Sequence, residues 1–183
     1  VMAGYRAPNY ASADSYPLMI LESVLSHGKS SRLYQRLVYD QKIALAVGAE
    51  YSLLQADPEL FYCFAVVKPG RKVEDVERAL YREIARLQTK PATAEELQRA
   101  KNQVEASYIF GQDSIFRQAM LLGQAETVGA GWKHVEEFVQ RIRGVTAEDV
   151  RRVAQRYLVE DSRTVGILIP TPARAKQAAA GAQ

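Results

Sequence analysis

The sequence predicts an α+β fold, in which a mostly antiparallel sheet packs against helices on one face. Apolar residues alternate with a period of two from the first position of the chain, which is typical of a strand. Two more strand-like segments, 44–53 and 59–67, are joined by the short turn 55–58 and are most simply an antiparallel hairpin. Helical spacing then dominates until a closing strand at 163–169, so strands and helices mix as in an α+β sandwich.

The chain begins with a strand and a helix. The strand covers residues 1–7 and is broken by the turn-forming residues that follow it. The helix begins at Ser12 or Ser15, and its apolar residues recur at the spacing of a core-facing side. It ends before Gly28, because glycine freely adopts the positive φ that terminates helices.

A short helix over 31–41 and the two strands of the hairpin come next. Ser30 or Ser31 can cap this helix by accepting a hydrogen bond from a first-turn amide. Along 44–53, one face is bulky and the other is small or polar, so the second face lets another group approach closely. Along 59–67, both faces are apolar, and we expect this strand to be central and covered on both sides.

The second half of the chain is mainly helical. Helical spacing resumes at Val73, and Thr93 begins a segment with capping-box spacing after Pro91 ends the preceding helix. Further helices are expected over 115–125, 132–142 and 146–157, before the closing strand, and the segment Thr146–Asp149 caps the last of them. We expect one domain over residues 1–170 and a disordered tail over 171–183, because the tail is rich in Ala and Gln with little to bury.

Composition limits the class of protein. The chain of 183 residues suits one domain, and its 24 basic and 21 acidic residues are too balanced to indicate a nucleic-acid-binding protein. The single cysteine, Cys63, excludes an internal disulfide and is expected to be a buried small hydrophobe. No apolar run could span a bilayer, and no signal peptide is present. A chain that starts inside a strand without Met is expected to be a piece of a longer protein.

The segment Leu25–Leu37 has the sequence LSHGKSSRLYQRL, which resembles a signature of the insulinase/pitrilysin family of zinc peptidases. This family includes the mitochondrial processing peptidase. It is similar to the version found in the second, non-zinc half, and residues 1–8 resemble the strand that opens that half. The resemblance implies a sheet backed by helices. It also implies a non-catalytic C-terminal domain that forms part of a peptide-enclosing chamber and contacts the zinc-bearing half.

The family's reaction uses a zinc-bound water held by an H-x-x-E-H motif and a distant third ligand. His27 and His134 are the chain's histidines, and neither has the required partners at the required spacing. Each is expected to have a surface or packing role. We therefore predict no catalytic residue, metal ligand or cofactor in this chain, and we expect zinc in the N-terminal half.

In active family members, the second half often supplies an arginine and a tyrosine that hold the substrate backbone, in a pattern resembling LRxxxxLxY. These positions map onto Val38 and Leu45, which donate no hydrogen bond from their side chains. Either a homologous partner subunit supplies the pair, which we favour, or the parent is an inactive paralogue with a structural or binding role. The cellular compartment stays open, with a periplasmic location compatible with bacterial relatives.

Other kinds of site find little support. Gly28-Lys29-Ser30 matches only the last three residues of the phosphate-binding motif G-x-x-x-x-G-K-[ST], because the upstream glycine of that motif is missing. Arg32 and Arg36, with Tyr34 and Tyr39 nearby, could bind an anion, but we prefer surface and core packing roles for them.

Overall fold

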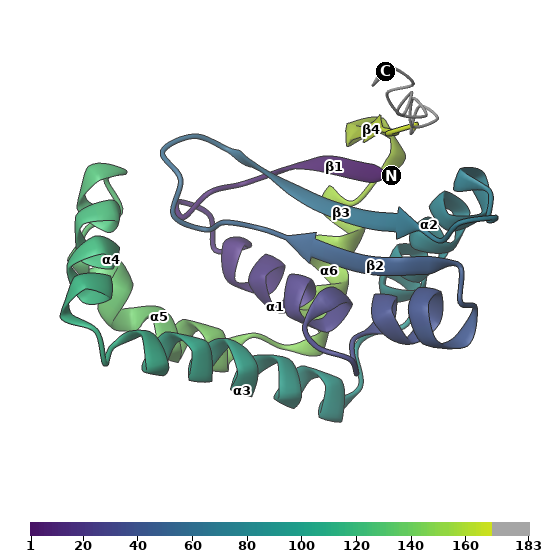
Figure 1. The fold of residues 1–183 in the computed structure, drawn as a ribbon. Coiled ribbons are helices and arrows are strands. Elements are labelled where there is room, and N and C mark those ends of the chain that lie inside the picture. Colours follow the sequence, from purple (N-terminus) through teal and green to yellow (C-terminus); the bar gives the residue numbers. More distant parts are fainter. Residues whose placement is uncertain (170–183) are drawn as a thin grey trace, which may run out of the picture.

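The structure, a computed structural model, describes residues 1–169. Its strands form one antiparallel sheet in the order β2-β3-β1-β4 (Figure 1). The strands are β1 (Met2–Ala7), β2 (Ala44–Glu50), β3 (Glu59–Val67) and β4 (Arg163–Gly166). The predicted hairpin is the β2–β3 pair, and the predicted strands at the two ends of the domain pair with each other, so both predictions are confirmed.

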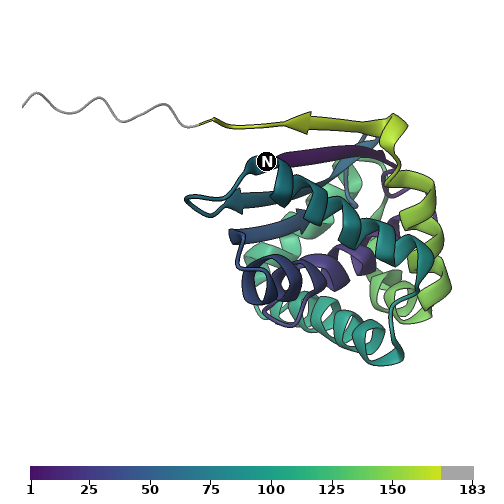
Figure 2. The ribbon, with the colours of Figure 1, turned by 90° about the vertical axis from the view of Figure 1, so that its right-hand side faces the viewer.

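Helices cover one face of this sheet, which confirms the predicted α+β class. Figure 2 shows the sheet along one side of the molecule, with α1 beneath it and α3 farther out. α1 contacts β2, α3, α5 and α6, and it is the centre of the core. The helical elements are α1 (Ser15–Ser26), η1 (Tyr34–Asp40), α2 (Val73–Thr89), α3 (Ala94–Gly111), α4 (Ile115–Thr127), α5 (Trp132–Gly144), α6 (Ala147–Tyr157) and η2 (Glu160–Ser162).

The core lies between α1 and the inner face of the sheet. Leu18, Ile20 and Leu21 of α1 are fully buried, as are Phe61 and Cys63 of β3. α1 is therefore apolar on more than one side, as expected of a helix that packs against a sheet and against other helices.

The prediction that β3 is covered on both sides is wrong for the described chain. β3 is central, between β2 and β1, but its residues alternate between buried and accessible. Leu60 is 48% exposed and Val66 is 47% exposed, although both are apolar. The helices pack on one face only, so the apolar residues of the other face remain accessible to solvent.

The small-residue face of β2 does let another group approach closely. Gly48 lies opposite Phe64 of β3, and a Cβ atom at Gly48 would overlap the Phe64 ring. The aromatic ring therefore covers the backbone where a side chain is missing, which requires glycine at this position.

Several predicted boundaries shift. The predicted helix over 31–41 is mostly a π-helix, η1, and β2 ends at Glu50 rather than at residue 53. β4 ends at Gly166 rather than at 169, and the tail predicted over 171–183 lies outside the described residues. Both capping boxes are present, at Thr93 and at Thr146. Within residues 1–169, no helix is long and apolar enough to cross a membrane.

Candidate functional site

The loop between α1 and η1 carries the distinctive residues of the sequence, and hydrogen bonds hold it in place. Ser31 Oγ donates to the carbonyl of Gly28 over 2.8 Å, and Gly28 has a φ of +75°. Ser26 Oγ donates to the carbonyl of Ala49 in β2 over 3.1 Å. The predicted serine cap is wrong, because η1 has no side-chain cap and Ser31 closes the preceding turn instead.

Arg32 joins this loop to the start of α3. Its Nε and Nη2 atoms donate to the two carboxylate oxygens of Glu96, each over 2.8 Å. Glu96 also accepts from the backbone amide of Thr93 in the capping box. The hydrogen bond from Arg32 is the main reason that the pKa of Glu96 falls to about 2. Arg32 thus holds a carboxylate of the same chain, a structural contact that the sequence analysis did not specify.

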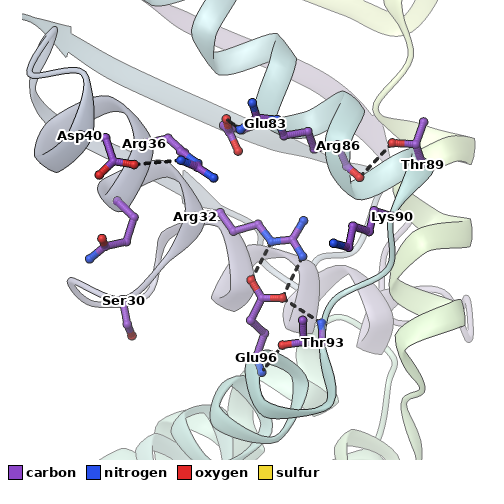
Figure 3. A pocket seen from close by; sticks show the side chains of 11 residues that line it. Ser30, Arg32, Arg36, Asp40, Glu83, Arg86, Thr89, Lys90, Thr93 and Glu96 are labelled. Atoms are coloured by element: carbon purple, nitrogen blue, oxygen red, sulfur yellow. Dashed lines mark hydrogen bonds and ion pairs between the residues drawn. The ribbon is translucent and has the colours of Figure 1, made fainter.

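The same pair borders a cavity of about 700 Å³ between η1, α2 and the start of α3 (Figure 3). Basic and acidic groups alternate around it. Arg36 bonds Asp40 over 2.9 Å, and Arg86 bonds the buried Glu83 over 2.5 Å. The lining residues are Ser30, Arg32, Gln35, Arg36, Asp40, Glu83, Arg86, Thr89, Lys90, Thr93 and Glu96. Because most of these charges are paired, the cavity is a poor site for a strongly charged ligand.

The positions mapped to the arginine and tyrosine pair lie at the end of η1 and the start of β2. Val38 is half-buried and packs against the core. Leu45 is 56% exposed and lies at an irregularity of β2, between Ala44 and Ala46. Neither side chain has a hydrogen-bond donor, so neither side chain can donate to a peptide carbonyl.

The two histidines lie apart in the fold. His27 is exposed at the end of α1. His134 is on α5, where its Nε2 atom is 2.8 Å from the hydroxyl of Tyr16 and its ring stacks on the Tyr16 ring. Burial, and then the charge of Arg141, lower the pKa of His134. Its environment is that of a packing residue, as predicted.

Residues 1–169 contain no group of three or more His, Cys, Asp and Glu side chains that could hold a metal ion. Cys63 is fully buried, and burial raises the pKa of its thiol to about 12. A thiol with so high a pKa is a poor nucleophile. The prediction that Cys63 is a buried small hydrophobe is confirmed.

Glu22 on α1 is a half-buried acidic residue that the sequence analysis did not single out. Burial, and then the nearby charge of Glu50, raise its pKa to about 7. A carboxyl group with such a pKa is typical of functional sites. Here, however, no metal-ligating cluster accompanies it in the described part of the chain.

The variant Glu22→Gln is expected to raise the free energy of unfolding at pH 8 by about 1–2 kcal/mol. The folded pKa lies above the unfolded value of about 4.3, so the ionised group disfavours folding. This penalty is absent below about pH 4, grows up to about pH 7 and is then constant. Urea unfolding at both ends of this range measures it, with the exposed Glu74→Gln as the control. A gain that is the same at both pH values would contradict this account of Glu22.

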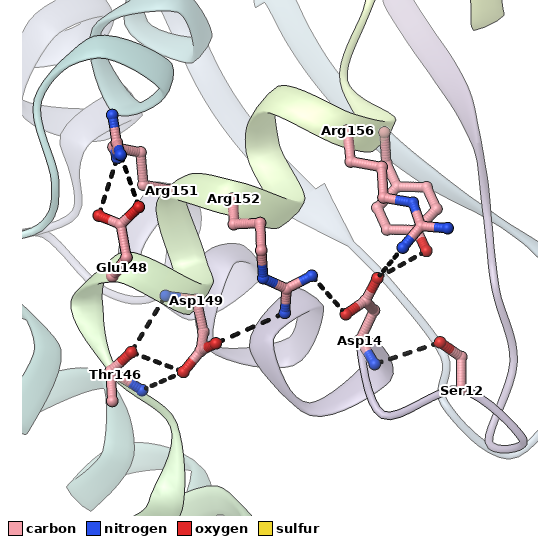
Figure 4. Close-up of polar contacts among 9 residues, drawn as sticks. Ser12, Asp14, Thr146, Glu148, Asp149, Arg151, Arg152 and Arg156 are labelled. Carbon is pink, nitrogen blue, oxygen red and sulfur yellow. Dashed lines mark hydrogen bonds and ion pairs between the residues drawn. The ribbon is translucent and has the colours of Figure 1, made fainter.

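Asp14 forms the most connected polar cluster outside the cavity (Figure 4). Its carboxylate accepts from Arg152 Nη1 over 2.7 Å, from Tyr157 Oη over 2.8 Å and from Arg156 Nη1 over 3.1 Å. Burial alone would raise the pKa of Asp14, but these hydrogen bonds and guanidinium charges together lower it. The cluster connects the residue before α1 to α6. It stabilises the fold and contains no group poised for chemistry.

Comparison with known protein families identifies a match to the peptidase M16 inactive domain over residues 1–104. An uncharacterized zinc protease of Streptomyces coelicolor is 28% identical over 173 residues. That match covers 93% of this chain and 37% of the relative, so the chain spans little more than a third of that relative's length.

Solved structures agree with this match. The inactive peptidase domain of a candidate zinc protease from Bordetella parapertussis is 28% identical, with a TM-score of 0.85. The match covers 94% of this chain and 93% of that one. A protease from Helicobacter pylori is 25% identical, with a TM-score of 0.81, and the match covers 88% of this chain but 38% of that chain. The same fold thus occurs as a separate crystallised domain and as part of a longer protease.

Proposed function

The chain belongs to the peptidase M16 inactive-domain family, and from this premise we propose that it is the non-catalytic wall of a peptide-enclosing chamber in a zinc endopeptidase. In this proposal, the domain covers residues 1–170 and contacts the zinc-bearing half of the same protein. In this proposal, the domain contributes shape on the substrate side, and the groups that polarise a carbonyl and activate water lie in the other half.

The observation that carries the proposal is the combination of a family match with partial coverage of longer relatives. The chain aligns with 37% of the Streptomyces coelicolor zinc protease and 38% of the Helicobacter pylori protease chain. A domain of this size leaves room in such relatives for another half. The proposal assigns zinc and its ligands to that half.

The residues of this chain do not fit a catalytic zinc ion themselves. A catalytic zinc site in proteins needs three protein ligands with an open position for water. His27 is exposed at the end of α1. His134 lies on α5, and its Nε2 atom is within hydrogen-bond distance of the Tyr16 hydroxyl on α1. No acidic or cysteine side chain completes a site around either histidine within residues 1–169.

Because Val38 and Leu45 occupy the positions of the family's arginine and tyrosine, the proposed chamber needs another source of these two side chains. At these positions, the chain lacks the arginine and tyrosine that the family uses to hold a peptide backbone. We propose that a homologous partner subunit supplies the pair across the chamber. The same substitution also favours a second candidate function, a structural or binding subunit derived from an inactive paralogue.

The test compares the full-length parent protein with a version that lacks residues 1–169 of this domain. We expect both to bind one zinc ion through the other half, and we expect cleavage of unfolded peptides to require the domain. A truncated protein that cleaves peptides as fast as the parent contradicts the chamber role. A full-length parent that binds no zinc and cleaves no peptide, with or without its homologous partner, supports the paralogue instead.

A further inference from the structure

Ser23 on α1 has a buried hydroxyl group without a partner. The residue is 4% exposed, and its Oγ atom makes no hydrogen bond with any other group of residues 1–169. A serine within a helix commonly bonds the carbonyl four residues earlier. Ser26 in the same helix does so, since its Oγ atom donates to the carbonyls of Glu22 and Ala49. Burying a hydroxyl without a hydrogen bond costs free energy, so we expect a partner for Ser23 from outside the described chain.

Ser23 borders a cavity of about 130 Å³ between α1, the loop that follows it and the first half of α3. A water molecule occupies about 30 Å³ in the liquid, so this cavity holds roughly four groups of that size. It admits a ligand of a few heavy atoms and is too small to enclose a nucleotide. Its wall shares Ser30 and Glu96 with the cavity of about 700 Å³ in Figure 3.

Glu96 and Arg99, which both border the smaller cavity, are unequally paired. Glu96 accepts from Arg32 at both carboxylate oxygens and also from the Thr93 amide. In the described part of the chain, Arg99 has one ion-pair contact of 3.3 Å, with Glu95, which is 87% exposed. A guanidinium has five N–H donors, and an exposed ion pair of this kind contributes little. The positive charge of Arg99 is therefore available to a ligand, whereas the negative charge of Glu96 is already neutralised.

We propose that this cavity binds a small oxyanion, either a phosphate ion or a carboxylate group. Arg99 supplies the opposite charge, and the Ser23 hydroxyl donates the hydrogen bond that it lacks within the described chain. His27 and Ser30 are exposed residues of the same wall and add donors from the loop after α1. An anion accepts from all of these groups, whereas a cation is repelled by the Arg99 guanidinium.

The proposed site differs from a phosphate-binding loop, although its wall includes Gly28 and Ser30. In the G-x-x-x-x-G-K-[ST] motif, successive amides of one glycine-rich loop hold the phosphates. Here the two principal groups, Ser23 and Arg99, lie on separate helices, so no local motif in the sequence indicates the site. The proposal is independent of the proposed function, because neither group needs zinc or a peptide substrate to bind an anion.

Titration of the purified chain with inorganic phosphate, followed by ¹⁵N–¹H NMR at constant ionic strength, tests the proposal. We expect saturable shifts of the amides of residues 28–31 and 99–103, which surround the cavity. A parallel titration with acetate shows whether phosphate or a carboxylate is the better ligand. Saturable binding of either anion at these amides supports the proposal.

Two variants assign the binding to the cavity. We expect Arg99→Gln and Ser23→Ala each to raise the dissociation constant of the better anion about tenfold, because each removes a hydrogen bond to a charged ligand. The matched control is Arg78→Gln on α2, where Arg78 pairs with Asp75 three residues away. This control should leave the dissociation constant unchanged, and the NMR spectra show whether each variant is folded. Shifts that do not saturate with either anion, or binding that both cavity variants leave unchanged, would overturn the proposal.

Discussion

The variant Asp14→Ala is expected to lower the free energy of unfolding by about 3 kcal/mol, the largest effect of any polar substitution that we predict. The Asp14 carboxylate is almost fully buried and accepts hydrogen bonds from Arg152, Arg156 and Tyr157. Removing it leaves these donors without their acceptor and separates the residue before α1 from α6. The estimate is at the low end for a buried ion pair, because Arg152 and Arg156 are 45% and 64% exposed and can turn toward water.

Urea unfolding at pH 7 measures this loss, and Asp57→Ala in the exposed turn before β3 is the control. The effect of Asp14 also depends on pH. Its folded pKa is lowered, so its stabilisation is present above the unfolded value of about 3.9 and is lost as pH falls below it. The difference between the wild type and Asp14→Ala should therefore shrink on acidification. If the variant is as stable as the wild type at pH 7, the cluster does not connect α1 and α6 energetically.

The variant Arg32→Ala is expected to lower the free energy of unfolding by about 2 kcal/mol. Arg32 and Glu96 are 16% and 22% exposed and form a bidentate pair that joins the distinctive loop to α3. The matched control is Arg36→Ala, in the next turn of the same segment. Arg36 and Asp40 are 51% and 43% exposed, so this pair should contribute less than about 0.5 kcal/mol.

A double-mutant cycle with Glu96→Ala separates the pair from the packing of each side chain. The pKa of Glu96 is about 2, so the coupling should be present above about pH 4.3 and should disappear as pH falls toward 2. If Arg32→Ala and Arg36→Ala lower the free energy of unfolding by the same amount, burial of the Arg32–Glu96 pair adds nothing to stability.

Local patterns in the sequence predicted most of the fold. The hairpin follows from two apolar segments joined by a short turn, and the capping boxes follow from Thr93 and Thr146 with an acidic residue three positions later. η1 was predicted as an ordinary helix, because apolar spacing shows which face is buried and not whether hydrogen bonds span four or five residues. β3 was predicted to be covered on both faces, since its sequence is apolar on both, but helices pack on one.

The polar clusters could not be predicted in this way. Asp14 and Arg152 are 138 positions apart, and nothing near either residue in the sequence indicates its partner. Arg32 and Glu96 are 64 positions apart, so the sequence indicated a packing role for Arg32 without its ion pair. The mapping of Val38 and Leu45 came from the resemblance to the family signature. Their sequence positions follow from that signature, whereas the partly exposed setting of Leu45 depends on the irregularity in β2.

The measurement that tests the central claim most directly is the zinc content of the purified chain after equilibration with zinc and removal of the unbound metal. The account predicts far less than one zinc ion per chain and no chelator-sensitive cleavage of unfolded peptides. One tightly bound zinc ion per chain, together with peptide cleavage that a chelator abolishes, would contradict it.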